Sequence, residues 1–326
     1  MQKKEGISLA VTLEVIVVAM VITVILHVPA QVFGSAVNCN IISAAGGNVG
    51  LDSDCDGFPD SLEQTGFTFP GTAAGSIPGF NSATGWSATT LDPSVKDLFV
   101  ILAPAATGSL FPSDAITILT SAAHNDLGIT VHPIAAAQAD SYLHVTPVQR
   151  AIKITESTVA NSSYFGLTEP GWTAVNYPDK TGSKSSLVYT TAIQTYVTAN
   201  CPASGCYLWN APTTKMTAAQ MVQAIIRHTI AHEAGHQMQL APIADQALGY
   251  HYPACNAVGC TPSILDQSIY VVGGVFYVGE DYTTADLAAV NLLQTYCYLP
   301  TTKLQTITSC VSTSNCATSA YECIYP

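Results

Sequence analysis

The chain has 326 residues and a net charge of −12, with 48% hydrophobic but only 10% charged residues. Its 10 lysines and arginines are too few to neutralise a run of phosphates, so the composition argues against nucleic acid as a partner. The length is enough for one large domain or two smaller ones, each with a hydrophobic core.

The N-terminus joins a short basic segment, residues 1–6, to a hydrophobic stretch over residues 7–30. A helix of about 20 apolar residues spans a bilayer, and the two lysines of the basic segment place the rest of the chain outside the cell. Three interpretations stay open: an uncleaved anchor, a secretory signal cleaved near residues 34–36, and a helix in the core of a filament. Glu14 favours the filament, because a glutamate in a lipid-facing helix is costly.

This leader resembles the class III leader of type IV pilins and archaeal pilins. The basic segment ends in Gly6, Ile7 opens the apolar helix, and that helix carries a single glutamate. In that family the chain is processed after the glycine and the helix packs into a filament. The resemblance therefore implies self-assembly into a surface filament, although Glu5 beside Gly6 departs from the family pattern.

Residues 31–66 are expected to form a connector that contains a calcium-binding loop. The acidic stretch fits D-x-D-x-D-G-x5-E, the pattern of an EF-hand loop. Ca²⁺ takes about six to eight oxygen ligands, and alternate residues of a tight loop supply them. The stretch looks most like the single calcium loops of secreted bacterial and archaeal proteins. The expected ligands are the side chains of Asp52, Asp54, Asp56, Asp60 and Glu63 and the backbone oxygen of Phe58.

From residue 91 onward the pattern predicts alternating strands and helices. A continuous apolar run predicts a buried strand over Leu98–Leu102, and a helix is expected over Pro112–Leu127. A second strand over Ile129–Ile134 completes a βαβ-like unit. Leu187–Val197 and Cys206–Trp209 are further predicted strands.

A long helix is predicted over Ala218–Leu240. Thr217 and Gln220 form a capping-box pattern at its start, and Pro242 cannot continue it. The helix contains the sequence His-Glu-Ala-Gly-His at residues 232–236, which fits the HExxH pattern of zinc sites.

Residues four apart lie on one face of a helix, so His232 and His236 can bind one Zn²⁺ ion. Glu233 is then the candidate catalytic residue, the general base that acts on a zinc-bound water. A chance match is the competing interpretation, and the strongly apolar helix around the motif disfavours it.

A catalytic zinc needs three protein ligands and one open position. His251 is the only histidine after the motif and is the favoured third ligand, while Glu280 and Asp245 stay as alternatives. His228 lies one turn before His232, at a different height along the helix, and is expected to be a core or supporting histidine.

The order of these features resembles metzincin-like zinc metallopeptidases. Leu91–Leu102 is similar to the opening strand of secreted bacterial metalloproteases, Thr261–Ile269 to the Met-turn beneath the zinc, and Tyr282–Tyr296 to the start of the last helix. The resemblance implies an α/β (α+β) zincin-like head over residues 91–326, with a mixed twisted sheet and an active-site helix. The family's glycine and methionine positions hold Gln239 and Leu265 instead.

The ten cysteines form an even set with close couples, which suggests disulfides in an oxidising compartment. No CxxC pair exists, so a zinc knuckle is disfavoured. We expect five local disulfides, drawn from Cys39, Cys55, Cys201, Cys206, Cys255, Cys260, Cys297, Cys310, Cys316 and Cys323.

The favoured function is that of an extracellular, surface-tethered endopeptidase that uses Zn²⁺, carries Ca²⁺ and cleaves peptide or protein substrates. It would be attached to the membrane through its N-terminal hydrophobic helix. The alternative is a type IV pilin-like filament subunit, or a structural or adhesive surface protein, whose head keeps a protease-like, metal-binding fold.

Overall fold

The computed structural model describes residues 39–42, 48–54, 56, 58–73, 75–79, 90–116, 119, 129–139, 143, 145, 151–160, 164–168, 186–238, 251–252, 255, 260–266, 268–283, 296–298, 304–306 and 322–323. The basic leader (1–6) and the predicted hydrophobic helix (7–30) lie outside these residues. Among the helices of the described part, none combines the length and hydrophobicity needed to cross a bilayer.

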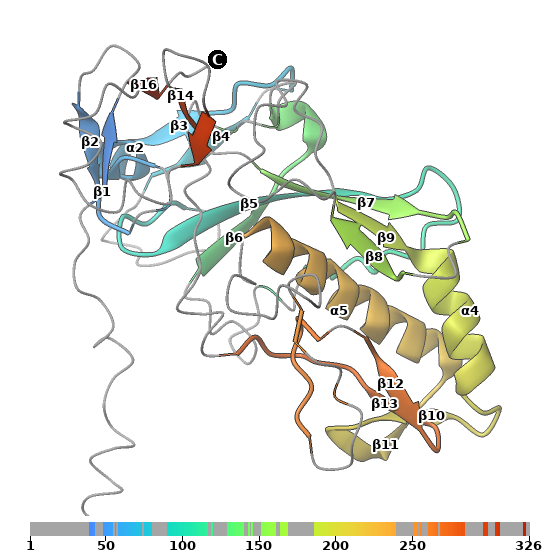
Figure 1. Ribbon diagram of the computed structural model, residues 1–326. Coiled ribbons are helices and arrows are strands. Elements are labelled where there is room, and N and C mark those ends of the chain that lie inside the picture. Colours follow the sequence, from blue (N-terminus) through green and yellow to red (C-terminus); the bar gives the residue numbers. More distant parts are fainter. Residues whose placement is uncertain are drawn as a thin grey trace, which may run out of the picture. The chain divides into compact units, whose positions relative to one another are not determined.

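A five-stranded mixed sheet is the framework for the rest of the fold (Figure 1), with strand order β6-β5-β7-β9-β8. Four strands run parallel, and β8 is the antiparallel edge strand beside β9. The two strands predicted around residues 98–102 and 129–134 are confirmed as the parallel pair β5 and β6. The strands are β5 (Lys96–Ala103), β6 (Ile129–Pro133), β7 (Ile152–Ser157), β8 (Gly166–Thr168) and β9 (Ser186–Tyr189).

Both faces of this sheet are buried, because alternate residues of a strand point to opposite sides. On β5, Leu98 and Val100 belong to the core that contains the long helix α5. Phe99 and Ile101 belong to a second core that includes Phe58 from the acidic loop. The acidic loop therefore lies against the face of the sheet opposite to α5.

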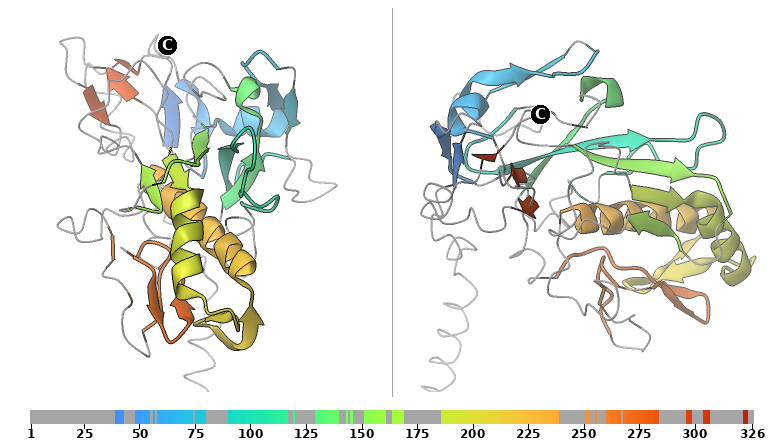
Figure 2. Two further views of the ribbon diagram at one scale, coloured as in Figure 1. Left: turned by 90° about the vertical axis from the view of Figure 1, so that its right-hand side faces the viewer. Right: turned by 45° about the horizontal axis from the view of Figure 1, so that its top comes forward.

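Two helices cover the face of the sheet to which Leu98 and Val100 point. α5 (Ala218–Gln237) contacts β7, β8 and β9, and α4 (Thr190–Asn200) packs beside it (Figure 2). The predicted capping box at the start of α5 is confirmed: the Thr217 side chain accepts a hydrogen bond from the backbone N–H of Gln220. The helix ends at Gln237, and residues 239–250 lie outside the described part.

The predicted strand over Leu187–Val197 is wrong for most of its length. Strand β9 ends at Tyr189, and helix α4 follows at once. Threonine and valine favour strands when considered alone. In the folded chain, however, a helix brings Ile193 and Val197 onto one face, and both side chains are fully buried there. Tertiary packing overrides the local preference.

A four-stranded sheet of order β11-β10-β13-β12 lies C-terminal to α4 and includes the predicted strand near Cys206. Two disulfides, Cys201–Cys206 and Cys255–Cys260, join cysteines that are close in the sequence, as expected. The other predicted pairs involve residues whose side chains lie outside the described part. The strands are β10 (Cys206–Leu208), β11 (Ala211–Met216), β12 (Tyr270–Val272) and β13 (Val275–Tyr277).

The remaining described elements are short. Helix α2 (Asp60–Thr65) follows the acidic loop, and η2 (Ala136–Gln138) is a single 3₁₀ turn. Of the helix predicted over 112–127, residues 113–116 form a turn and most of the rest lies outside the described residues, as does most of the helix predicted from Tyr282. Three small sheets contain β1 (Cys39–Ile42) with β2 (Asn48–Asp52), β3 (Gly66–Thr68) with β4 (Ser76–Pro78), and β14 (Tyr296–Tyr298) with β15 (Leu304–Thr306) and β16 (Glu322–Cys323).

The described part of the chain is thus a mixed α/β fold, which confirms the expected fold class at this coarse level.

Candidate metal centre

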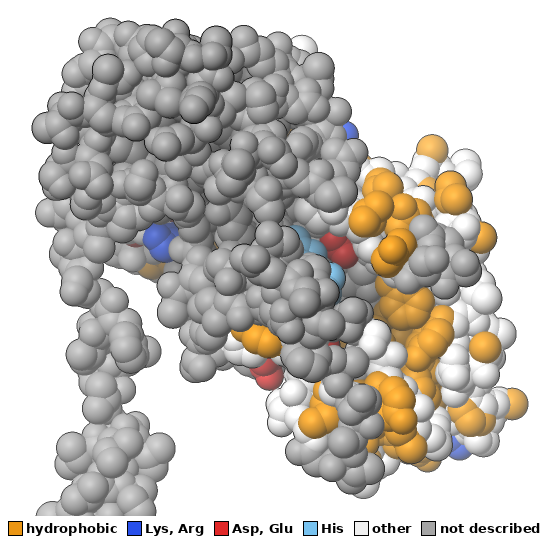
Figure 3. Space-filling model, viewed as in Figure 1, with side chains coloured by type: hydrophobic (Ala, Val, Ile, Leu, Met, Phe, Trp, Pro, Cys, Tyr) orange, Lys and Arg blue, Asp and Glu red, His pale blue; other side chains and the backbone are white. Residues whose placement is uncertain are grey.

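Three histidines converge at the C-terminal end of α5. His232 and His236 lie one turn apart on the helix, and His251 joins them from the segment that follows. Their Nε2 atoms form an equilateral triangle, since each pair is 3.1 Å apart. In the face shown in Figure 3, histidine side chains (pale blue) and an acidic side chain (red) are visible near the centre. The structure therefore brings together the three residues that the sequence favoured as zinc ligands.

The size of this triangle fits Zn²⁺. The centre of a triangle with 3.1 Å sides lies about 1.8 Å from each corner. Zinc binds histidine nitrogen at about 2.0–2.1 Å, slightly more than this distance, so all three nitrogens could contact one ion. Three histidine nitrogens would also match the three protein ligands that a catalytic zinc requires.

A hydrogen bond to a backbone oxygen fixes the orientation of the His232 ring. Its Nδ1 atom lies 2.7 Å from the backbone oxygen of Ile264. A carbonyl can only accept a hydrogen bond, so we assign the ring proton to Nδ1. The lone pair of Nε2 then points at His236 and His251. Metal-binding histidines are commonly held in this way by a carbonyl or carboxylate.

Burial keeps His232 and His236 neutral, which is the form that binds metals. It lowers the pKa of His236 to about 3, and the neighbouring His251 ring adds to the effect. The pKa of His232 is also well below its ordinary value, mainly through burial and further through its histidine neighbours. Three rings with converging nitrogens, two of them kept neutral by burial, form a site suited to a cation.

Glu233 lies on the adjacent face of α5, against the edge strand β8. Its side chain is buried, with 3% exposed, and its carboxylate accepts a hydrogen bond from the Thr168 hydroxyl at 2.5 Å. Burial raises the pKa of Glu233 to about 8, and the hydrogen bond from Thr168 opposes the rise. A nearby cation would favour the ionised form of this carboxyl.

Glu280, one of the two alternative ligands, does not join the cluster. Glu280 instead accepts a hydrogen bond from the side-chain amide of Asn210 at 2.5 Å. Asp245 lies outside the described residues. His228 is buried, and its Nδ1 atom lies 2.7 Å from the backbone oxygen of Gly279. It supports the segment that packs beneath the helix, as the sequence predicted for a core histidine.

The acidic loop gathers part of the predicted calcium ligand set. Carboxylate oxygens of Asp54, Asp56 and Glu63 lie within 4.8 Å of one another, and Asp56 and Glu63 have no exposed surface. Three carboxylates so close together repel one another, and a bound cation would offset that repulsion. The cluster therefore fits the calcium site that the sequence predicted.

Of the other predicted calcium ligands, Asp60 and Phe58 are described with their side chains. The carboxylate of Asp60 accepts hydrogen bonds from the backbone N–H and the hydroxyl of Ser53, at 2.8 and 2.7 Å. The Asp52 side chain lies outside the described part. Phe58 turns its ring into the second core, where it is fully buried.

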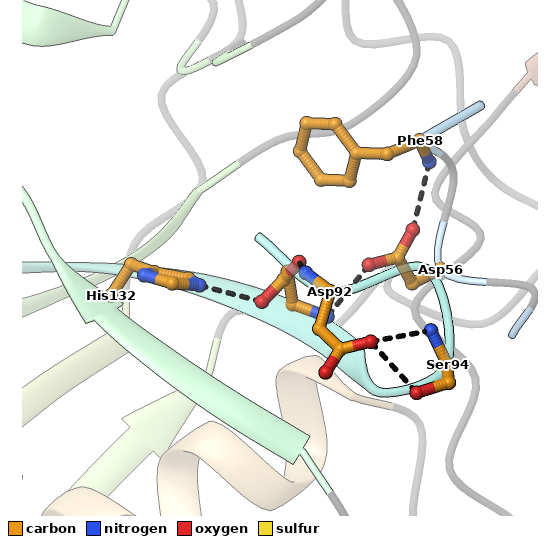
Figure 4. A network of polar contacts seen from close by, with 6 residues as sticks. Asp56, Phe58, Asp92, Ser94 and His132 are labelled. Carbon is orange, nitrogen blue, oxygen red and sulfur yellow. Dashed lines mark hydrogen bonds and ion pairs between the residues drawn. The ribbon is translucent and has the colours of Figure 1, made fainter. Parts of the chain in front are cut away.

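A polar network ties this loop to the sheet (Figure 4). The Asp56 carboxylate accepts hydrogen bonds from the backbone N–H groups of Phe58 and Asp97, at 2.8 and 2.6 Å. The carboxylate of Asp97 contacts Nε2 of His132 on β6 at 2.6 Å. Burial raises the pKa of Asp97, and the contact with His132 opposes the rise. Asp56 thus serves both the acidic cluster and the start of β5.

Sequence reasoning missed the partners of Glu233. Thr168 lies 65 residues before it and belongs to a short strand that no pattern indicated. The carbonyl of Ile264 was missed as a partner of His232, although the segment that contains it was expected to lie beneath the metal. Residue types do not indicate which backbone oxygen will accept a hydrogen bond from a distant side chain.

Comparison with protein-family models, with curated proteins and with solved structures finds no match for this chain.

Proposed function

We propose that this chain is a zinc-dependent endopeptidase that hydrolyses peptide or protein substrates outside the cell. One observation carries the proposal: three Nε2 atoms meet, 3.1 Å apart in pairs, on and beside the helix that contains Glu233. A chance HExxH match gives no reason for a third histidine, 15 residues beyond His236, to complete the set.

In this proposal His232, His236 and His251 hold the metal, and Glu233 is the catalytic residue. A bound Zn²⁺ supplies a Lewis acid that polarises the peptide carbonyl and lowers the pKa of water. The Glu233 carboxylate takes a proton from the attacking water and passes it to the leaving amine. The carbonyl of Ile264 keeps the His232 ring in the tautomer that leaves Nε2 free.

We further infer that residues 91–326 form a metzincin-like head with α5 as its active-site helix. Residues 7–30 would form a membrane-spanning or filament-core helix that tethers this head to the cell surface. The two disulfides support an oxidising environment outside the cytoplasm. Ca²⁺ would bind at Asp54, Asp56 and Glu63 and stabilise the acidic loop.

The test compares zinc content and peptide cleavage in the wild type, Glu233→Gln and Glu280→Gln. Glutamine keeps the shape of the side chain but cannot take the proton. We expect all three proteins to bind one zinc per chain. Cleavage should fall at least about a hundredfold in Glu233→Gln, because general-base catalysis contributes that much or more. Glu280→Gln, which changes a carboxylate outside the cluster, should stay near wild type. Equal cleavage by the wild type and Glu233→Gln would rule the proposal out.

One observation favours the alternative of a structural surface head. Only 3% of Glu233 is exposed, and its carboxylate already has a partner in Thr168. A head that binds metal only for packing or adhesion needs no accessible base. Stoichiometric zinc binding by the wild type, without cleavage of any peptide in a mixed library, would support this alternative. Shed surface material would then be examined for filaments by electron microscopy.

A further inference from the structure

The Glu233 carboxyl is enclosed by the edge strand β8. The Thr168 hydroxyl lies 2.5 Å from Oε2 of Glu233. A methyl group added at Gly166 would lie 2.1 Å from Oε1, far closer than van der Waals contact allows. Leu167, the middle residue of β8, separates these two contacts along the strand. The carboxyl is therefore held between one residue that donates a hydrogen bond to it and one that must have no side chain.

A chain of polar groups continues behind Thr168. Its hydroxyl lies 2.7 Å from the hydroxyl of Ser186 on β9. The side-chain amide nitrogen of Gln237 lies 2.6 Å from the same Ser186 hydroxyl and 3.1 Å from the backbone oxygen of Lys153 on β7. Gln237 and Glu233 are one helical turn apart, so both ends of the chain of contacts return to the same face of α5.

The direction of these hydrogen bonds follows from the groups at the ends. The carbonyl of Lys153 can only accept, which assigns the Gln237 atom near it as the nitrogen, and that nitrogen can only donate. Ser186 accepts from Gln237, so its own proton is free to go to Thr168. Thr168 accepts from Ser186 and directs its proton at Glu233. The network thus presents a donor to Oε2 of Glu233 and fixes that atom in place.

We propose that Thr168 is a positioning residue for Glu233: its hydroxyl, oriented by Ser186 and Gln237, fixes the carboxyl in the space that Gly166 leaves open. The edge strand β8 thereby determines the position from which the Glu233 carboxyl, on helix α5, acts on the substrate. The catalytic consequence rests on the proposed function, whereas the placement of the carboxyl does not. Thr168 acts through Glu233 and is not itself given a chemical step.

The placement is tested by carbodiimide labelling of carboxyl groups in the full-length chain, read by mass spectrometry, without metal and with Zn²⁺. Thr168→Val removes the hydroxyl and keeps the shape, Thr168→Ser keeps the hydroxyl, and Gly166→Ala displaces the carboxyl while the hydroxyl remains. We expect severalfold more labelling of Glu233 in Thr168→Val and Gly166→Ala than in the wild type, and wild-type labelling in Thr168→Ser. Equal labelling in the wild type and both disruptive variants would overturn the proposal.

Two other carboxyl groups serve as internal controls for folding. Glu156 is buried and should stay protected in every variant, whereas Asp114 is exposed and should label equally in all of them. If Glu156 becomes labelled in Thr168→Val, that variant has lost its fold. Gly166→Ala then decides the question, because the three atoms nearest to its added methyl all belong to the Glu233 side chain.

The catalytic arm measures kcat and KM for the zinc-loaded proteins. Thr168→Val should lower kcat by between about tenfold and a hundredfold with KM unchanged, since small displacements of a catalytic group have effects of this size. Thr168→Ser should restore kcat to near wild type. Unchanged kcat in Thr168→Val, despite increased labelling, would show that positioning has no catalytic effect. A wild type that cleaves nothing would refute the proposed function, and the labelling experiment would still decide the placement.

Discussion

The Nδ1 atom of His232 lies 2.7 Å from the backbone oxygen of Ile264. This contact joins helix α5 to a segment 32 residues further along the chain, and Ile264 itself is fully buried. It explains why the Nε2 lone pair of His232 points at the two other histidines. The segment that was expected to lie beneath the metal thus contacts the proposed ligand His232 through a backbone oxygen. Leu265, which stands where the resemblance expects methionine, makes no difference to this hydrogen bond.

The third ligand can be identified by comparing His251→Ala with Glu280→Ala. His251 contributes one corner of the nitrogen triangle, whereas Glu280 binds Asn210 outside it. Loss of one of three ligands should weaken zinc binding by orders of magnitude, so His251→Ala should lose its metal on dialysis against a weak chelator. Glu280→Ala should keep it. Metal analysis after dialysis gives the answer, and full retention in His251→Ala would contradict the assignment.

The metal-free protein should lose stability as the pH falls below about 6.5, in part through His228. Burial lowers the pKa of this residue from 6.5 to about 4, so the unfolded chain binds the proton first. The contribution of neutral His228 to the free energy of unfolding is complete above pH 6.5. It is lost as the pH falls from 6.5 to about 4. His228→Asn keeps a donor for the Gly279 oxygen but takes up no proton. The slope of unfolding free energy against pH should then fall by about 1.4 kcal/mol per pH unit. Urea unfolding between pH 4 and pH 7 measures both slopes, and equal slopes would contradict the prediction.

Glu156→Gln should destabilise the fold at neutral pH by about 2 kcal/mol, because hydrogen bonds to a charged group are lost. The Glu156 carboxylate accepts bonds from four groups, and although burial raises its pKa, these bonds outweigh burial and lower it overall. The stabilisation is present above the ordinary pKa of 4.5 and is lost as the pH falls further. The difference from wild type in urea unfolding should therefore shrink in acid. The four donors are Ala105, Ser109, Leu110 and Thr190.

The matched control for Glu156 is Asp114→Asn. Asp114 forms a two-pronged ion pair with Arg227, with contacts of 2.6 and 2.9 Å to the same nitrogen, but both side chains are partly exposed. Exposed ion pairs contribute at most about 1 kcal/mol. A larger loss in Asp114→Asn than in Glu156→Gln would contradict the importance given to the buried carboxylate.

Calcium should raise the melting temperature of the wild type but not that of Glu63→Gln. Glu63 is fully buried within the acidic cluster, and glutamine removes its charge with little change in shape. Asp56 is a poorer choice for this test, because it also accepts hydrogen bonds from Phe58 and Asp97. Gln64→Ala, at the exposed next position, is the control and should respond to calcium as the wild type does. Thermal unfolding with added Ca²⁺ and with a chelator makes the measurement, and a calcium response in Glu63→Gln equal to that of the wild type would contradict the site.

Local patterns predicted the elements whose own residues decide their conformation. The Thr217–Gln220 capping box marked the start of α5, and the apolar run at Leu98 marked β5. The prediction of a strand across Leu187–Val197 was wrong because a stretch with threonine and valine can form either a strand or a helix. Contact with α5 and the sheet decided for the helix.

The sequence by itself determined which residues could form each site. Helical spacing placed His232 and His236 on one face, and loop spacing selected the acidic residues around Asp56, since both rules depend only on neighbours along the chain. Tertiary structure decided the rest. It brought His251, and not Glu280, beside the two helix histidines. It also oriented His232 with the carbonyl of Ile264 and placed Thr168 against the Glu233 carboxyl. These partners are distant in the sequence, and they meet only because the packing of α5 on the sheet brings their strands and segments together.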